Sequence, residues 1–444
     1  MLYNKEIETL ALPKLRALQN ERLTTLVHRL YEKVPFYKRQ FDEAGITPMD
    51  IRGVEDLHKI PFTKKTDLRD NYPFDLFVVP QNEVLRIHAS SGTTGKPTVV
   101  GYSRKDLDIF DEVVARSLVA AGARPGMKLH NAYGYGLFTG GLGMHGGATK
   151  LGMAVIPVSG GMTDRQLMIL QDFKPEVMCC TPSYAQTLAE ECKKRGIDTA
   201  ELAVQYAILG AEPWTDTIRA QVEAGLNVNA TNIYGLSEII GPGVSQEDYE
   251  EKGSGSYIWE DHFYPEIVDR DTGEPLPYGE EGVLVFTTIS KEAMPLLRYW
   301  TNDICSIYYD SAAKRTHIKM SAIKGRADDM LIVRGVNLFP SQVEVLIDEF
   351  EHFVPNYQLE VSREGTMDEV KVNIELSESL SNAIGVDGLS ANEQVKQLIH
   401  DFRQKIKNNI GLSMDVNVQP FGKIPRSAGG KLSRVKDLRK LDSK

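Results

Sequence analysis

A run of nine residues, SSGTTGKPT from Ser90 to Thr98, offers a hydroxyl, a bare backbone N–H or a positive charge at nearly every position. Glycine lets the backbone approach a ligand closely, while hydroxyls, N–H groups and a lysine can donate to phosphate oxygens. The spacing differs from that of the nucleotide-triphosphatase P-loop, because two residues separate Gly92 from Gly95 and Pro97 follows the lysine. The run therefore predicts a phosphate-binding loop with other spacing, and a solvated surface loop is the alternative.

Two further groups of polar residues follow predicted strands. The word GAEP, residues 210–213, comes after an apolar run at 204–209, and YGLSE, residues 234–238, ends another at 228–234. Ligands of parallel sheets bind beyond the carboxyl ends of the strands. Tyr234 offers a ring to adenine, and Glu238 offers a hard oxygen ligand to Mg²⁺. Both residues could instead pack and solvate the start of a helix.

The stretch between residues 106 and 234 alternates in a regular way between helical and strand-like patterns. This rhythm predicts a parallel sheet with helices on both faces. Before it, residues 5–40 read as amphipathic helix, and Thr66 and Asp67 are placed to cap a short helix that ends at Pro73. The predicted strands are 128–133, 154–158, 177–180, 204–209 and 228–234, and the predicted helices are 106–122, 163–173, 183–195 and 215–224.

The pattern changes after Gly241. Residues of about 242–322 alternate apolar and polar side chains between Gly/Pro turns, which predicts a β-rich subdomain. Beyond it, a helix from Ser341, strand-like runs and a helix at 391–408 indicate a compact α+β unit. The fold class is therefore α/β, with mixed and parallel sheets flanked by helices in the larger N-terminal part.

Composition limits the classes of function. The chain has 444 residues, is 42% hydrophobic and carries a net charge of −10, which predicts two or more domains with an acidic surface and excludes a nucleic acid partner. The four cysteines lack metal-binding spacing, and disulfides are not expected. No signal core or run of 18 apolar residues occurs, so we expect a cytoplasmic protein that does not bind a membrane.

The word SSGTTGKP is similar to the phosphate-binding loop of adenylate-forming enzymes, the acyl-CoA synthetases and their relatives. Within them, IPFTKKTDLRDNYPF at 60–74 and AYGYGLFTGG at 132–141 most resemble the phenylacetate–CoA ligase group. The resemblance runs from about residue 30 to the C-terminus with five family words in order. It implies that ATP activates an aryl acid, with phenylacetate expected, as acyl adenylate, and that CoA then displaces AMP. ATP, Mg²⁺ and CoA are the implied cofactors.

The resemblance also assigns residues to roles. It implies a hinge at Asp328 between an N-terminal domain, 1–326, and a small mobile C-terminal lid, 327–444. Lys96, Glu238 and Lys431 become catalytic residues, with Glu238 on magnesium and Lys431 between the attacking carboxylate and the α-phosphate. The resemblance assigns the binding of the aryl group to Tyr133, Tyr135, Gly136 and Phe138. It assigns the binding of the phosphates and the nucleotide to Ser90, Ser91, Gly92, Thr93, Thr94, Gly95, Gly210, Ala211, Glu212, Pro213, Tyr234, Gly235, Ser237, Asp303 and Arg326.

Some positions depart from the family pattern. Trp300 and Asn302 stand where relatives usually carry Arg, and Gly429-Gly430 doubles the glycine before Lys431. Asp261 and His262 are expected to be structural, and His145 to be a hydrogen-bonded residue of the core. Relatives carry a Cys and a His just upstream, where this chain has Asp248 and Tyr257, and we therefore expect no zinc.

Other functions stay open at this point. The enzyme could adenylate another aromatic acid, or pass the activated group to another acceptor, as in related enzymes that transfer a nucleotidyl group to a coenzyme. A phosphoryl-transferring ATPase and a non-catalytic nucleotide-binding protein are the alternatives outside adenylate formation. A homodimer is compatible with the sequence, which does not decide the oligomeric state.

Overall fold

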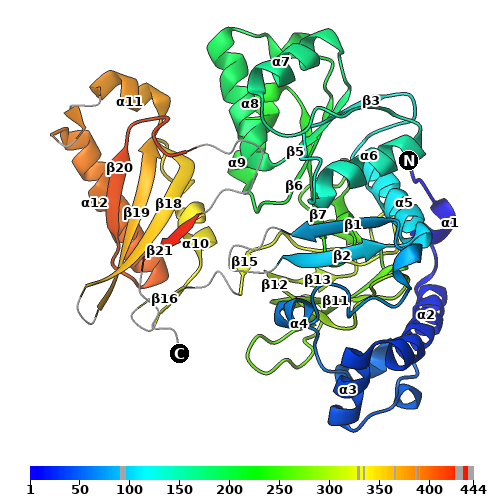
Figure 1. The fold of residues 1–444 in the computed structure, drawn as a ribbon. Coiled ribbons are helices and arrows are strands. Elements are labelled where there is room, and N and C mark those ends of the chain that lie inside the picture. The colour runs from blue at the N-terminus through cyan, green and yellow to red at the C-terminus, as the bar shows by residue number, and fades with distance from the viewer. Residues whose placement is uncertain are drawn as a thin grey trace.

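The computed structural model describes residues 1–90, 97–327, 331–333, 336–364, 367–385, 388–389, 391–425 and 434–438. The chain forms a large N-terminal part and a smaller part built from the C-terminal helices and strands (Figure 1). Several predicted site residues lie outside the described residues, namely Ser91, Gly92, Thr93, Thr94, Gly95, Lys96, Asp328 and Lys431.

The N-terminal segment forms three helices instead of the single amphipathic helix predicted. These are α1 (Lys5–Glu8), α2 (Leu12–Lys33) and α3 (Pro35–Ala44). Pro13 and Pro35 each stand in the first turn of a helix, where a missing N–H costs nothing. Four leucines of α2 are buried, as their spacing predicts, namely Leu15, Leu23, Leu26 and Leu30, whereas Leu12 is exposed.

The short helix α4 (Lys65–Asp70) begins two residues earlier than a cap at Thr66 would require. Lys64 is the residue that precedes the helix, and the carboxylate of Asp67 accepts from its backbone N–H at 2.6 Å. The prediction of a cap at Thr66 was therefore wrong, whereas Asp67 does hold the helix start from its third position.

A nine-stranded sheet forms the centre of the large part, in the order β13-β14-β9-β8-β7-β6-β5-β3-β4. The five strands from β7 to β4 run parallel, as predicted, and β8 pairs antiparallel with β7. The strands are β3 (Lys128–Asn131), β4 (Ala154–Ile156), β5 (Val177–Cys180), β6 (Tyr206–Gly210), β7 (Asn229–Leu236), β8 (Gly241–Glu247), β9 (Ser256–Ile258), β13 (Ile307–Tyr308) and β14 (Lys319–Met320).

Helices cover both faces of this sheet. Successive strand residues enter different core clusters: Cys179 packs with the cluster that includes α5 and α6, and Cys180 with the cluster that includes α7, α8 and α9. Side chains that alternate along a strand point to opposite faces, so the two clusters fill the two sides of the sheet. The helices are α5 (Arg104–Ala120), α6 (Thr139–Leu151), α7 (Thr163–Asp172), α8 (Pro182–Arg195) and α9 (Asp216–Leu226).

The strand-rich stretch at 242–322 divides between sheets. Four of its strands join the nine-stranded sheet, and three form a second antiparallel sheet with a strand that follows the stretch. That sheet has the order β10-β11-β12-β15, with β10 (Phe263–Val268), β11 (Gly282–Thr288), β12 (Tyr299–Cys305) and β15 (Gly325–Arg326). A separate hairpin consists of β1 (Arg86–Ser90) and β2 (Thr98–Tyr102).

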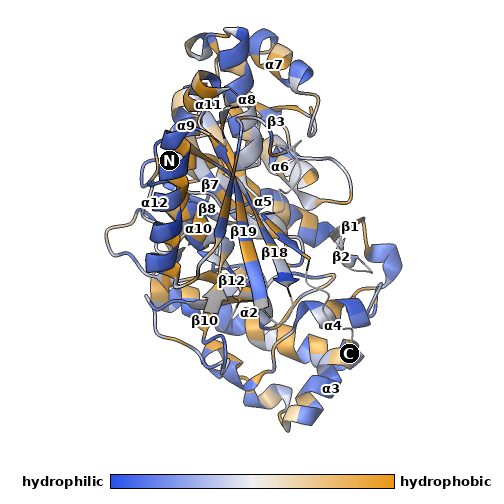
Figure 2. Ribbon diagram, turned by 90° about the vertical axis from the view of Figure 1, so that its left-hand side faces the viewer, coloured by the Kyte–Doolittle hydropathy of each residue, from blue (hydrophilic) through white to orange (hydrophobic). Residues whose placement is uncertain are grey.

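The C-terminal part has its own buried core, which joins a four-stranded sheet in the order β20-β19-β18-β21 to its helices. Hydrophilic and hydrophobic residues alternate along its surface helices (Figure 2). No helix among the described ranges is long and apolar enough to span a membrane. The elements are β16 (Leu331–Val333), β17 (Val336–Leu338), α10 (Pro340–Ile347), β18 (Phe353–Glu364), β19 (Met367–Leu376), α11 (Glu378–Ile384), α12 (Glu393–Ile410), β20 (Asp415–Gln419) and β21 (Val435–Asp437).

Candidate active site

Three predicted site residues, distant in sequence, meet around one carboxylate. The hydroxyl of Tyr234 donates to Oδ2 of Asp303 at 2.5 Å, and Nη1 of Arg326 donates to Oδ1 at 3.1 Å. The pairing of β12 with β15 sets Asp303 directly opposite Arg326. Burial raises the pKa of Tyr234 well above its usual value, and the charge of Asp303 adds to this, so the hydroxyl stays protonated and donates. Carboxylate oxygens have further lone pairs, which could accept the hydroxyls of a ribose.

Glu238 lies in the turn that follows β7, and only 5% of its surface is exposed. Its Oε1 is 3.9 Å from Nζ of Lys65. Tyr299 lies beside the same carboxylate, and burial, followed by the charge of Glu238, raises its pKa well above the usual value. A single carboxylate at a strand end suits Mg²⁺, which takes few protein ligands and fills its shell with phosphate oxygens and water. The residues present therefore fit the implied ion.

Two lysines at this turn were not predicted from the sequence. Lys65 lies in the segment 60–74, which pointed to the ligase group but gave no role to any one residue. Lys291 is buried, and its Nζ donates to the backbone oxygen of Glu238 at 3.1 Å. Burial lowers the pKa of Lys291 to about 8, although the charges of Asp106 and Glu238 act in the opposite direction. No local pattern around Lys291 signals this contact.

The backbone of the two strand-end words requires glycine. A Cβ on Gly235 would lie 1.8 Å from the backbone oxygen of Gly241, and one on Gly210 would lie 2.1 Å from that of Ile233. Such approaches exclude any side chain, which fixes how closely the neighbouring strands pack. Ser237, in the same turn, places its hydroxyl 3.1 Å from that of Thr139.

The GAEP segment is tied to the adjacent helix. Ala211 has a φ of 71°, and Glu212 accepts from both the backbone N–H and the hydroxyl of Ser183, at 3.2 and 2.6 Å. Pro213 follows and is exposed. The segment thus lies at the end of β6, beside the YGLSE word at the end of β7, as the parallel order predicts.

The aromatic segment after β3 places its three rings in different surroundings. Tyr133 is buried in the main core, and burial raises the pKa of its hydroxyl well above the usual value. Tyr135 accepts from Nδ2 of Asn131 at 2.7 Å and lies 3.1 Å from Nδ1 of His145, so His145 is hydrogen bonded, as predicted. Phe138 precedes α6 and is 40% exposed. The space around Gly136 is open, since an added Cβ would meet nothing within 4 Å.

The hairpin β1–β2 brings the two ends of the predicted phosphate loop together. Ser90 ends β1 and pairs with Thr98 at the start of β2.

Asp261 accepts from Arg116 at 2.8 and 3.0 Å, and Nδ1 of His262 lies 2.7 Å from the hydroxyl of Ser290, in agreement with their expected structural roles. Among the described residues, His, Cys, Asp and Glu form no group of three placed to hold a metal ion.

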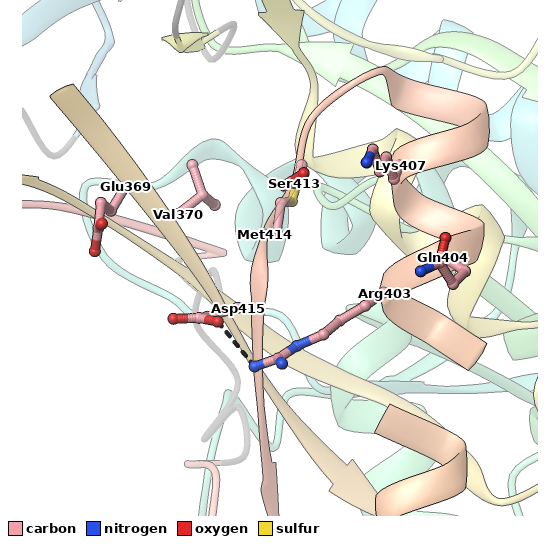
Figure 3. Close-up of a pocket in the computed structure, with 8 residues that line it drawn as sticks. All are labelled: Glu369, Val370, Arg403, Gln404, Lys407, Ser413, Met414 and Asp415. Carbon is pink, nitrogen blue, oxygen red and sulfur yellow. Dashed lines mark hydrogen bonds and ion pairs between the residues drawn. The ribbon is translucent and has the colours of Figure 1, made fainter. Parts of the chain in front are cut away.

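A cavity of about 350 Å³ lies in the C-terminal part, where Arg403 and Asp415 face each other in an ion pair at 2.8 Å (Figure 3). None of the predicted site residues lines it. A second cavity, of about 450 Å³, includes Lys65, Trp300 and Asn302, and it lies next to the candidate site because Lys65 approaches Glu238. The indole of Trp300 donates to Oδ1 of Asn302 at 2.8 Å, so these two departures from the family pattern bond to each other.

Known protein families match the chain along most of its length. The model described as AMP-binding enzyme covers residues 13–290, and that described as AMP-binding enzyme C-terminal domain covers residues 335–439. The chain is 63% identical to a phenylacetate-coenzyme A ligase of Thermus thermophilus, with 99% of this chain and 100% of that protein covered. It is 51% identical to a phenylacetate-coenzyme A ligase of Escherichia coli, with 98% and 97% covered.

Solved structures of 2-hydroxyisobutyryl-CoA ligase are similar over the whole chain. The postadenylation state in complex with 2-HIB-AMP has a TM-score of 0.89 at 26% identity, covering 97% of this chain and 91% of that one. The thioesterification state, in complex with 2-HIB-AMP and CoA, has a TM-score of 0.71 at 27% identity, with 98% and 92% covered. The TM-score is therefore higher for the postadenylation state than for the thioesterification state.

Proposed function

Because this chain belongs to the family of AMP-binding enzymes, we propose that it is an ATP-dependent acid–thiol ligase that activates phenylacetate and transfers it to CoA. The observation that carries the proposal is the meeting of Tyr234, Asp303 and Arg326 beside the turn of Glu238, at the carboxyl end of β7. The near full-length identity to two phenylacetate-coenzyme A ligases supports this acid and this acceptor.

The reaction has two steps. A carboxylate oxygen of the acid attacks the α-phosphorus of ATP and pyrophosphate leaves. The CoA thiol then attacks the acyl carbon, loses its proton and releases AMP. Asp303 and Arg326 hold the ribose, and the ring of Tyr234 lies against adenine. Glu238 would hold Mg²⁺, which would neutralise phosphate charge when bound. Lys96 and Lys431 are assigned to the phosphates on the family resemblance.

We divide the chain into an N-terminal domain, 1–326, and a C-terminal lid, 327–444, with Asp328 as hinge. Separate hydrophobic cores on either side of this boundary support the division. The two family models also end and begin on either side of it. Four buried cysteines, each a free thiol, agree with a cytoplasmic location.

The test is an assay of acid-dependent pyrophosphate release and thioester formation with ATP, Mg²⁺ and CoA. Phenylacetate should be compared with indoleacetate, benzoate and a fatty acid. We expect AMP, pyrophosphate and phenylacetyl-CoA together. Pyrophosphate without a thioester would redirect the search to another acceptor, release of ADP would favour an ATPase, and nucleotide binding without turnover would contradict the proposed enzyme.

Replacing Asp303 by Asn should raise the KM for ATP about 10-fold to 100-fold while leaving the KM for phenylacetate nearly unchanged. The amide keeps the size of the side chain but removes the charge that Arg326 faces and one acceptor for the ribose, and each hydrogen bond to a charged group contributes about 1.5–3 kcal/mol. Steady-state kinetics with each substrate varied in turn checks this. An equal rise in both KM values would point to a general loss of structure.

Replacing Lys431 by Ala should abolish adenylation but retain much of the second step. A lysine carried by a mobile lid would act only in the pose that brings it to the phosphates. Supplying phenylacetyl adenylate with CoA measures the second step alone. Equal loss of both half-reactions would contradict the assignment of Lys431.

A further inference from the structure

Lys291 is a buried cation within hydrogen-bond distance of the turn that carries Glu238. Its residue is 2% exposed, and its ammonium lies 5.3 Å from the centre of the Tyr102 ring. Lysine is rarely buried to this extent, because removing an ammonium from water is costly unless the site compensates for it. An apolar side chain of the same length would avoid that cost. The position therefore calls for a function of the charge.

The segment that carries Lys291 is itself fixed in place. The carboxylate of Asp106, in the first turn of α5, accepts from the backbone N–H groups of Glu292 and Ala293 at 2.6 and 2.8 Å. The hydroxyl of Ser103 donates to the side chain of Glu292 at 2.6 Å. These bonds fix the backbone that directly follows Lys291. The Lys291 side chain therefore starts from a fixed point, and its buried ammonium has a defined direction.

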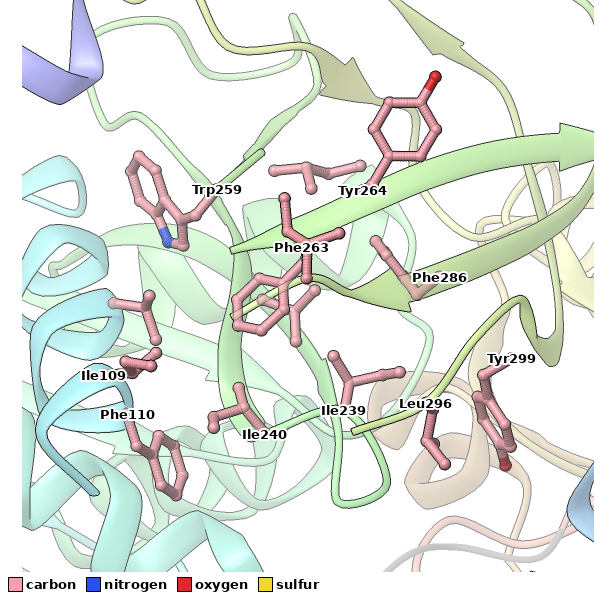
Figure 4. Packing of buried hydrophobic residues seen from close by; sticks show 14 of the residues in the cluster. Ile109, Phe110, Ile239, Ile240, Trp259, Phe263, Tyr264, Phe286, Leu296 and Tyr299 are labelled. Atoms are coloured by element: carbon pink, nitrogen blue, oxygen red, sulfur yellow. The ribbon is translucent and has the colours of Figure 1, made fainter. Parts of the chain in front are cut away.

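The turn of residues 237–240 is held from two directions. Lys291 donates to the backbone oxygen of Glu238, and the hydroxyl of Tyr102 donates to that of Ile240 at 2.8 Å. Ile239 and Ile240 enter the hydrophobic core beside Phe110 and Phe263 (Figure 4). The two isoleucines anchor the end of the turn, whereas Lys291 holds the residue whose side chain faces Lys65 and Tyr299.

We infer that Lys291 is a positioning residue for adenylation, whose buried ammonium fixes the main chain of Glu238 and so directs its carboxylate to the nucleotide-bound magnesium. The inference rests on the proposed function of Glu238. An ammonium suits this task because it makes a charge-assisted bond to a carbonyl that no other described side chain contacts in this way. A carboxylate that is held in advance loses little freedom when the ion binds.

The test compares Lys291→Met with a matched control, Lys319→Met. Lys319 is also buried, and its ammonium lies 4.8 Å from the centre of a tyrosine ring. It pairs with Glu251 and Asp310. Lys319 lies on β14, and two other strands of the sheet stand between β14 and β7. Both variants lose a buried ammonium and keep an unbranched side chain that is one atom shorter. Effects of general destabilisation should therefore appear in both variants, and effects on the Glu238 turn in Lys291→Met alone.

Two measurements separate positioning from stability. In the protein without nucleotide or metal, hydrogen exchange of the amides at 237–240 should be at least 10-fold faster in Lys291→Met and unchanged in Lys319→Met. Calorimetry should show the affinity for ATP with Mg²⁺ falling about 10-fold in Lys291→Met, with a much smaller change when Mg²⁺ is omitted. Supplied phenylacetyl adenylate should still react with CoA at a rate within about threefold of the wild-type rate.

The outcomes distinguish a failure of the role of Lys291 from a failure of the proposed function. Unchanged exchange at 237–240, or an equal loss of nucleotide affinity with and without Mg²⁺, would overturn the role of Lys291. A wild-type protein that lacks acid-dependent pyrophosphate release would instead overturn the proposed function, whatever the exchange data show. If Lys291→Met does not fold, Lys291→Arg takes its place, because it retains the charge and should keep the Mg²⁺-dependent affinity for ATP. Loss of that affinity in a folded Lys291→Arg protein, with slow exchange at the turn, would also overturn the role of Lys291.

Discussion

Replacing Glu238 by Gln lowers the rate of adenylation about 100-fold, and the Mg²⁺ concentration for half-maximal activity rises with it. The amide keeps the size of the side chain but removes the negative charge that we propose binds the ion, and interactions that stabilise developing charge at such sites contribute this much to the rate. The new amide would also direct its N–H₂ or its oxygen toward Lys65, 3.9 Å from the present carboxylate. Pyrophosphate release at varied Mg²⁺ measures both effects.

Glu247→Gln is the matched control for this experiment. Glu247 is also a buried carboxylate, on the neighbouring strand β8, and it accepts from Arg219 at 2.7 Å and from two backbone N–H groups. Its replacement should lower the melting temperature while leaving the Mg²⁺ dependence unchanged. Similar Mg²⁺ curves for the wild type and Glu238→Gln would remove Glu238 from the metal site.

Replacing Arg315 by Met destabilises the fold by about 3–5 kcal/mol, the usual effect of leaving a buried charge without its partner. The Arg315 side chain is fully buried and bonds to two carboxylates, Glu8 at 2.6 Å and Asp248 at 2.5 Å. Both carboxylates are themselves buried, so the substitution leaves Glu8 without its arginine, while Asp248 keeps only Lys314, at 3.5 Å. Chemical denaturation measures the change in the free energy of unfolding.

A triple variant tests whether charge is the cause. Adding Glu8→Gln and Asp248→Asn to Arg315→Met removes both buried carboxylate charges and should recover part of the lost stability, because neutral amides cost less to bury. No recovery would mean that the packing of the arginine side chain, whose guanidinium carbon lies 5.0 Å from the centre of the Tyr257 ring, dominates. Arg363, which is partly exposed and pairs with Asp368, is the control, and Arg363→Met should cost at most about 1 kcal/mol.

The sequence predicted most of the elements because their patterns are local. The strand at 177–180 was placed without error, and the predicted helix at 183–195 begins at Pro182 and ends at Arg195. The words GAEP and YGLSE lie at the ends of adjacent parallel strands, as the α/β rhythm requires. The residues that could be named in the site are those that stand in such words.

What the sequence did not predict depends on contacts between distant segments. Lys291 reaches Glu238 across 53 positions, and Asp106 holds the segment of Lys291 across 186 and 187 positions. The strands after Gly241 read alike, yet backbone pairing divides them between two sheets. Neither periodicity nor composition contains information on such partners. The roles of the phosphate loop, Asp328 and Lys431 stay predictions from the family resemblance.

The first ten residues of the chain are joined to a segment made much later during synthesis. The backbone oxygen of Glu8 accepts from the N–H of Thr316 at 3.1 Å, that of Leu10 accepts from its hydroxyl at 2.7 Å, and His317 lies 3.2 Å from the backbone oxygen of Ile7. Glu8 and Arg315 are 307 positions apart. At translation rates of about 5–20 residues per second, α1 waits roughly 15–60 s before its partner leaves the ribosome. Newly made chains therefore keep Glu8 in water until Arg315 has been made, and α1 joins the large part only after that point.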